Sequence, residues 1–183
     1  MRWLAFLAAS LLVACSQPPP IPSTCSITFG DQGSVRLFVV GHRFSLRDAD
    51  SADAYDASIR RHLAAIQPCL SSARPNLIVF PEDAGLVTWF LGRRGLYARN
   101  VSDSATAFNA LYAGMFRAAD EYRTRFPGIS PARSMELAAS DPAWRAMDRT
   151  FGGLARDTGA WVMTSANIPV SHRSRDGRDA VLR

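Results

Sequence analysis

The sequence predicts a layered α/β domain in which helices pack on a sheet. Strand-like and helix-like segments follow one another in the order β-α-β-α-α-α-β, which is typical of that class. Residues Leu77–Phe80 form a wholly apolar run, which predicts a strand buried on both faces. Hydrophobic residues make up 48% of the chain, so a sizeable core is available.

The first half of the domain is predicted to contain two strands and a helix. The first strand covers 35–40, and an amphipathic helix follows over 50–67. Four apolar residues of that helix share one face: Tyr55, Ile59, Leu63 and Ile66. The second strand, Leu77–Phe80, ends at Pro81, because proline cannot donate a hydrogen bond to a neighbouring strand. Glu82 is therefore expected at the carboxyl end of a central strand, where α/β folds place their ligands.

Three helices are predicted between the second and third strands. A long helix begins near Ser102 or Asp103, since either is a good N-cap. Its buried stripe is predicted to be Phe108, Tyr112, Met115, Ala119 and Tyr122. Ser130-Pro131 and Asp141-Pro142 each pair a capping residue with a proline suited to the first helical position. Two further helices are therefore expected to begin at these dipeptides.

The last predicted helix leads into a third strand. Its core positions are predicted to be Trp144, Met147, Phe151 and Leu154, which are spaced as on one face of a helix. Gly159 ends the helix, and the strand covers 160–165. Residues 179–183 resemble the opening of another strand, so the domain is expected to be incomplete at the carboxyl end.

The amino terminus has the pattern of an export signal. In residues 1–14, Arg2 precedes an apolar run that is too short to span a membrane. Leu12-Val13-Ala14-Cys15 resembles a bacterial lipobox, which implies cleavage before Cys15 and its lipidation. Residues 15–33 include a proline-rich stretch suited to a tether, and the domain covers 34–183. We expect an extracytoplasmic protein anchored to a bacterial membrane; the alternative is an ordinary secretory signal with an incidental cysteine.

The other two cysteines and the charges give weaker indications. Cys25 and Cys69 would face an oxidising compartment, which favours a disulfide over a nucleophilic thiol, because neither has a basic neighbour. The net charge is +5 and every basic residue is arginine. These arginines are scattered, so they could favour anionic lipid headgroups but form no stripe that predicts nucleic-acid binding. The sequence contains no phosphate-binding glycine loop or zinc-ligand spacing, and we expect no cofactor or metal.

The element order and two motifs resemble the first half of a nitrilase-superfamily carbon–nitrogen hydrolase. The resemblance covers roughly 35–169 and rests on Pro75–Glu82 and on Gly159–Pro169. It implies a four-layer α-β-β-α sandwich, frequent homo-oligomers, and hydrolysis of an amide or nitrile through a thioester. Members of the family use a glutamate base, a lysine and a cysteine nucleophile, and Glu82 matches the glutamate. Taken alone, an acid after a proline is more often a solvated loop residue or a helix cap.

The rest of the family's catalytic set has no match. The chain contains no lysine, and arginine is no substitute because its charge is fixed and its geometry differs. The family cysteine lies on a later strand than the chain reaches, and neither Cys25 nor Cys69 fits its context. The sequence is therefore interpreted as an amino-terminal fragment of an active enzyme or as a catalytically dead descendant.

Two alternative functions remain open, and two further polar residues follow predicted strands. A non-catalytic binding or scaffold lipoprotein could keep the fold without the chemistry. An apolipoprotein N-acyltransferase-like enzyme fits less well, since those proteins carry several membrane-spanning helices. His42, after the first strand, is predicted to be a hydrogen-bonding structural residue. Asn167 is given no catalytic role.

Overall fold

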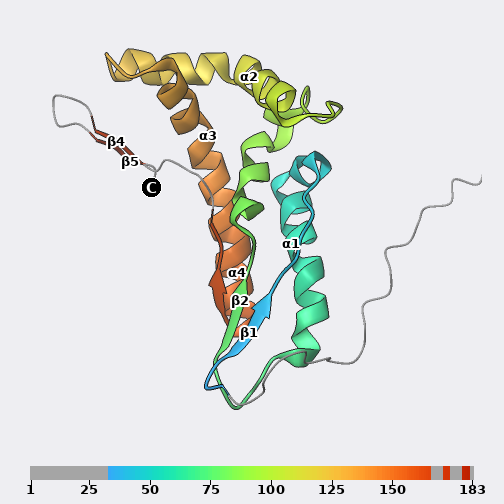
Figure 1. Cartoon of the computed structure of the whole chain (residues 1–183). Coiled ribbons are helices and arrows are strands. Elements are labelled where there is room, and N and C mark those ends of the chain that lie inside the picture. Colours follow the sequence, from blue (N-terminus) through green and yellow to red (C-terminus); the bar gives the residue numbers. More distant parts are fainter. Residues whose placement is uncertain (1–32, 166–170, 174–178, 182–183) are drawn as a thin grey trace, which may run out of the picture.

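The chain forms a small parallel sheet with helices packed against it (Figure 1). The computed structural model describes residues 33–165, 171–173 and 179–181. Its larger elements, in chain order, are β1 (Arg36–Val39), α1 (Ala52–Ile66), β2 (Asn76–Val79), α2 (Ser104–Arg125), α3 (Pro131–Met147), α4 (Gly153–Thr158) and β3 (Trp161–Met163). The predicted α/β class is confirmed, and the order β-α-β-α-α-α-β is as predicted, although the sixth element begins at Gly153 and not at Asp141.

The described residues also form several shorter elements. Four are 3₁₀ helices: η1 (Leu46–Ala49), η2 (Gln67–Cys69), η3 (Glu82–Phe90) and η4 (Gly92–Gly95). A π-helical segment, η5 (Asp148–Gly152), joins α3 to α4. Beyond β3, the strands β4 (Ser171–Arg173) and β5 (Asp179–Val181) pair with each other as an antiparallel sheet.

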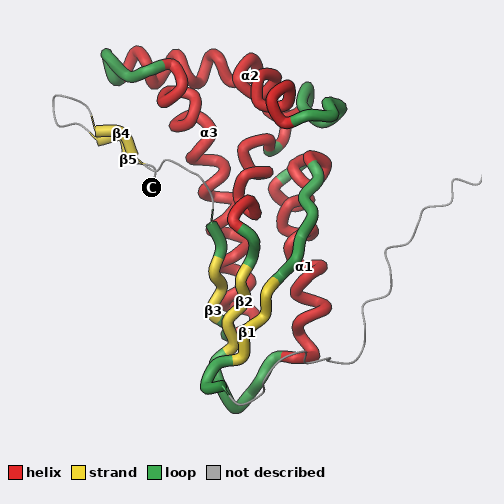
Figure 2. Tube along the Cα trace, viewed as in Figure 1, coloured by secondary structure: helices red, strands yellow, loops and turns green. Residues whose placement is uncertain are grey.

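The three-stranded sheet has two very different faces. Its order is β1-β2-β3, all parallel, with β2 in the middle (Figure 2). On one face Ile78 is fully buried and lies in register between Phe38 and Val162, which pack with it against the helices. On the other face large apolar side chains are open to solvent, with Val39 75% and Trp161 76% exposed.

This one-sided covering corrects the prediction that the strand Leu77–Phe80 is buried on both faces. Ile78 and Phe80 are buried, but Leu77 and Val79 point to the other face and are only half-buried. Leu77 lies in register between Leu37 and Trp161, so the open face is a continuous apolar surface. In the described part of the chain, helices cover only one side of the sheet.

The core lies between the sheet and the helices. In α1, Tyr55, Ile59 and Leu63 are buried as predicted, and Ile66 is half-buried. Their cluster also contains buried residues of the sheet and of the later helices, among them Phe80 and Phe151, whose rings meet edge to face with centroids 5.0 Å apart. Because these residues come from distant parts of the sequence, the cluster joins the first and last elements of the domain.

The helix α2 begins where one of the two predicted caps lies. The side chain of Asp103 accepts a hydrogen bond from the backbone N–H of Thr106 at 2.8 Å, which makes it the N-cap. The buried residues of α2 are Ala107, Leu111, Met115 and Ala119. Two of the five predicted positions are thus buried, while Phe108, Tyr112 and Tyr122 lie half-buried beside this stripe. The non-aromatic residues occupy the centre of the contact and the rings occupy its flank.

A helix start predicted at Asp141-Pro142 is wrong. The helix α3 begins after Ser130, as predicted, but continues through Pro142 to Met147. Proline costs a helix interior one hydrogen bond. Here Ala139 and Ala143 are buried in the core that α3 shares with η3, and this packing outweighs the local signal. The break comes at η5 instead, and Gly159, with a φ of 64°, ends α4 as predicted.

The core positions predicted for the last helix are confirmed except for one. Met147, Phe151 and Leu154 are buried as expected, whereas Trp144 is exposed. The four residues do not share one regular α-helix: Trp144 and Met147 lie in α3, Phe151 lies in the π-helical η5 and Leu154 lies in α4. The π-helical segment changes the number of residues per turn, so the spacing of a regular helix does not hold across it.

Several predictions fall outside the described residues. The signal at 1–14, the lipidated Cys15, the tether and Cys25 belong to this group, as does Asn167. Cys69 takes part in a disulfide, but its pairing with Cys25 stays a prediction. Over 33–165, 171–173 and 179–181, no helix combines the length and apolar character needed to cross a membrane.

Candidate functional site

Glu82 lies at the carboxyl end of the middle strand, as the sequence predicted. The backbone N–H of Phe80 donates to the carbonyl of Met163 at 2.9 Å, so pairing with β3 continues up to the residue before Pro81. Pro81 is the N-cap of η3, and Glu82 is its first residue, with an exposed side chain. The carboxylate therefore lies at the carboxyl ends of the parallel strands, where parallel folds bind their ligands.

The segment that carries Glu82 is tied to the core. The hydroxyl of the fully buried Tyr55 donates to the carbonyl oxygen of Ala84 at 2.8 Å, which joins α1 to η3. Burial raises the pKa of this hydroxyl far above its usual value, so it stays a donor. The half-buried guanidinium of Arg94 donates to the carbonyls of Thr88 and Ala139, at 3.4 and 3.3 Å, and so links η3 to α3.

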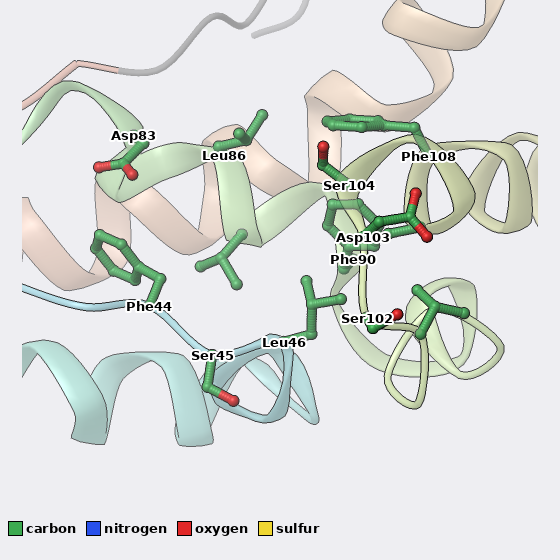
Figure 3. Close-up of a pocket in the computed structure, with 13 residues that line it drawn as sticks. Phe44, Ser45, Leu46, Asp83, Leu86, Phe90, Ser102, Asp103, Ser104 and Phe108 are labelled. Atoms are coloured by element: carbon green, nitrogen blue, oxygen red, sulfur yellow. The ribbon is translucent and has the colours of Figure 1, made fainter.

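A cavity of about 270 Å³ opens beside η3 (Figure 3). It lies between the segment around η1, the helix η3 and the first turn of α2. Its wall is mainly apolar: the largest contributions come from Phe44, Leu46, Leu86, Phe90, Val101 and Phe108. Two carboxylates, Asp83 and Asp103, belong to the same wall. Glu82 does not line the cavity, but its neighbour Asp83 does.

A histidine pair borders the cavity. His42 follows β1, and its Nδ1 is a hydrogen-bond partner of Nε2 of His62 on α1. The ring of His42 also meets the edge of Phe44, a wall residue, with the centroids 3.8 Å apart. The sequence led us to expect a hydrogen-bonding role for His42, and this contact fits that role, but nothing in the sequence pointed to His62.

The surroundings of the pair favour neutral imidazoles. Burial lowers the pKa of both rings, and in His42 the charge of His62 lowers it further. Arg61 acts in the same direction on both, while Asp48 opposes the shift on both and Asp83 opposes it on His42. The net result is a lowered pKa for each ring.

Stability is expected to fall in acid because of this pair. The folded pKa values lie below the ordinary 6.5, so the unfolded chain binds protons first as the pH falls. The contribution is complete above about pH 6.5 and decreases as the pH falls from there through the folded pKa values. Thermal midpoints compared at about pH 7.5 and about pH 5 should show the loss, and His62→Gln should reduce it. A parallel loss in His62→Gln would mean that other groups cause it.

A tight glycine contact shapes one wall of the cavity. A Cβ on Gly95 would overlap the backbone carbonyl oxygen of Phe90, whose side chain lines the cavity. We expect Gly95→Ala to lower the free energy of unfolding by about 2–3 kcal/mol, since the backbone itself must move. Gly41→Ala is the matched control, with nothing within 4 Å of the added carbon, and should change it by less than about 0.5 kcal/mol. Denaturant unfolding measures both; equal midpoints would show that the Phe90 backbone yields easily.

Neither metal-binding residues in the described ranges nor known relatives indicate a function for this site. Within the described ranges, no group of three or more histidine, cysteine or acidic side chains is arranged to hold a metal ion. Comparison of the chain with protein-family models, with curated proteins and with solved structures gives no match in any of the three. A functional assignment therefore depends on the residues at the carboxyl ends of the strands and on their geometry.

Proposed function

We propose that this chain is the amino-terminal part of an exported carbon–nitrogen hydrolase that is anchored to a bacterial membrane by a lipid on Cys15. Its substrates are amides or nitriles, and Glu82 is the general base. The observation that carries the proposal is the position of Glu82, directly after the central strand of a parallel sheet and beside an apolar cavity. A carboxylate at such an edge is well placed for acid–base chemistry.

The proposed architecture is the nitrilase-like α-β-β-α sandwich. Helices pack on one face of the sheet, and the other face exposes large apolar side chains, including Leu37, Val39 and Met163. An apolar surface of this kind is rare on a soluble protein unless something covers it. A second sheet would cover it and give the four layers. Stacking of such sandwiches into homo-oligomers belongs to the same proposal.

In the proposed reaction Glu82 acts twice. It first takes the proton of a cysteine thiol; the thiolate attacks the amide carbon, and Glu82 gives the proton to the departing nitrogen, so that ammonia or an amine leaves and a thioester remains. It then takes a proton from water, which attacks the thioester to give a carboxylic acid, and passes that proton to the departing sulfur, which frees the thiol. The nucleophilic cysteine and a lysine would come from a segment outside residues 1–183, which contain no lysine.

The absence of lysine also favours a second candidate, a non-catalytic scaffold lipoprotein with the same fold. Reading the coding sequence past codon 183 separates the two. The hydrolase predicts a lysine at a strand end and a cysteine after a later strand, together with ammonia release from small amides by the complete gene product. A stop codon after Arg183, or no release of ammonia, would leave the scaffold.

A further inference from the structure

The cavity beside η3 has a mainly apolar wall that also contains two carboxylates, which differ in their hydrogen bonding. Of the thirteen described residues that line it, eight are apolar, and three of these are phenylalanines. Its volume of about 270 Å³ lies just below the range of roughly 300–1,000 Å³ that is usual for drug-sized ligands. A ligand of amino-acid size, with an aromatic or branched aliphatic body, matches this space.

The charge of the wall selects against anions. Among the described residues that line the cavity are Asp83 and Asp103 but no arginine, lysine or histidine. Asp103 is engaged in capping α2, and its hydrogen bonds to that helix lower its pKa, so it stays ionised. Figure 3 shows Asp83 near Phe44 at one end of the cavity and Asp103 toward the other. Asp83 is thus the carboxylate that a cationic group of a ligand can approach.

Asp83 connects the cavity with the proposed base. It lines the cavity and is the residue next to Glu82, which does not line it. A ligand that holds a cation at Asp83 and presents an amide toward Glu82 needs those two groups close together in the molecule. In an amino-acid amide, the ammonium and the amide are separated by a single carbon, and the side chain extends from that carbon.

We infer that the cavity binds small amides of apolar amino acids, with the ammonium at Asp83 and the side chain among Phe44, Leu86 and Phe90. As a statement about substrates, this rests on the proposed function and narrows its substrate class. As a statement about binding, it depends only on the cavity and its charges.

Binding of two matched probes to the full chain tests the inference. Phenylalaninamide carries the ammonium, and 3-phenylpropanamide has the same body and amide without it. Titration calorimetry should give about fivefold tighter binding for phenylalaninamide, the size expected for a partly exposed ion pair. In Asp83→Asn the two probes should bind equally. Leu86→Trp should weaken both by filling the cavity.

The control is Asp120→Asn, an exposed acid on α2 outside the cavity wall, which should keep the fivefold ratio. Equal binding of the two probes to the unchanged chain, or a ratio unaffected by Asp83→Asn, would overturn the inference. A retained ratio without ammonia release by the complete gene product would refute the proposed function and leave the binding site. Release from neutral amides without any ammonium preference would refute only the inference.

Discussion

In the complete gene product, replacing Glu82 with glutamine is expected to lower the rate of amide cleavage by about a thousandfold, within the range for losing a general base. Glutamine keeps the size of the side chain but cannot take the proton of a thiol or of water. Stability should change by less than about 0.5 kcal/mol, because Glu82 is exposed at the start of η3. Ammonia release from a small amide and thermal unfolding measure the two effects separately.

The matched control for this change is Glu121→Gln, which makes the same substitution at an exposed position of α2. It should leave the rate of cleavage unchanged. If Glu82→Gln retains more than about a tenth of the rate, another group acts as the base. Asp83 and His42 would then be the first to test, since Asp83 lines the cavity and His42 contacts its wall.

Local signals in the sequence were enough to place most element boundaries. Asp103, Ser130 and Gly159 act at helix ends through their own side chains or backbone, so each could be recognised without knowing the fold. Pro142 carries an equally clear local signal but lies inside α3. There the burial of neighbouring alanines decides the structure, and that burial depends on segments distant in the sequence.

The site could be predicted only in part, for a related reason. Glu82 follows a recognisable strand and proline, so its place at the sheet edge was predictable. The cavity is assembled from residues between Phe44 and Phe108 that follow no common period, and it could not be read from spacing. The contact between His42 and His62 likewise joins a strand end to a helix across twenty positions.

The two faces of the sheet were also indistinguishable in the sequence. Leu77 and Val79 are as apolar as Ile78, so the strand carries no alternation that marks one face as solvent-facing. Within the part of the chain that the structure describes, only the Ile78 face is covered. An apolar run that predicts two buried faces, found with one of them open, is the pattern expected when a further layer belongs on the sheet.

Placing a charge on the open face is therefore expected to destabilise the complete gene product strongly. Leu37 is 57% exposed in the described structure and lies in register with Leu77. If a second sheet covers it, Leu37→Asp buries an unpaired carboxylate, which should cost about 3–5 kcal/mol. Leu96→Asp makes the same change at a 50% exposed residue outside the sheet and should cost less than about 0.5 kcal/mol.

Denaturant unfolding of the two variants at several protein concentrations separates the possible coverings. A large loss in Leu37→Asp that is independent of concentration means that the chain's own second layer covers the face. A loss that grows as the concentration rises means that a second copy does so, because association then stabilises the unchanged chain more than the variant. Equal, small losses in both variants would mean that the face remains in contact with water, and the proposed sandwich would be wrong.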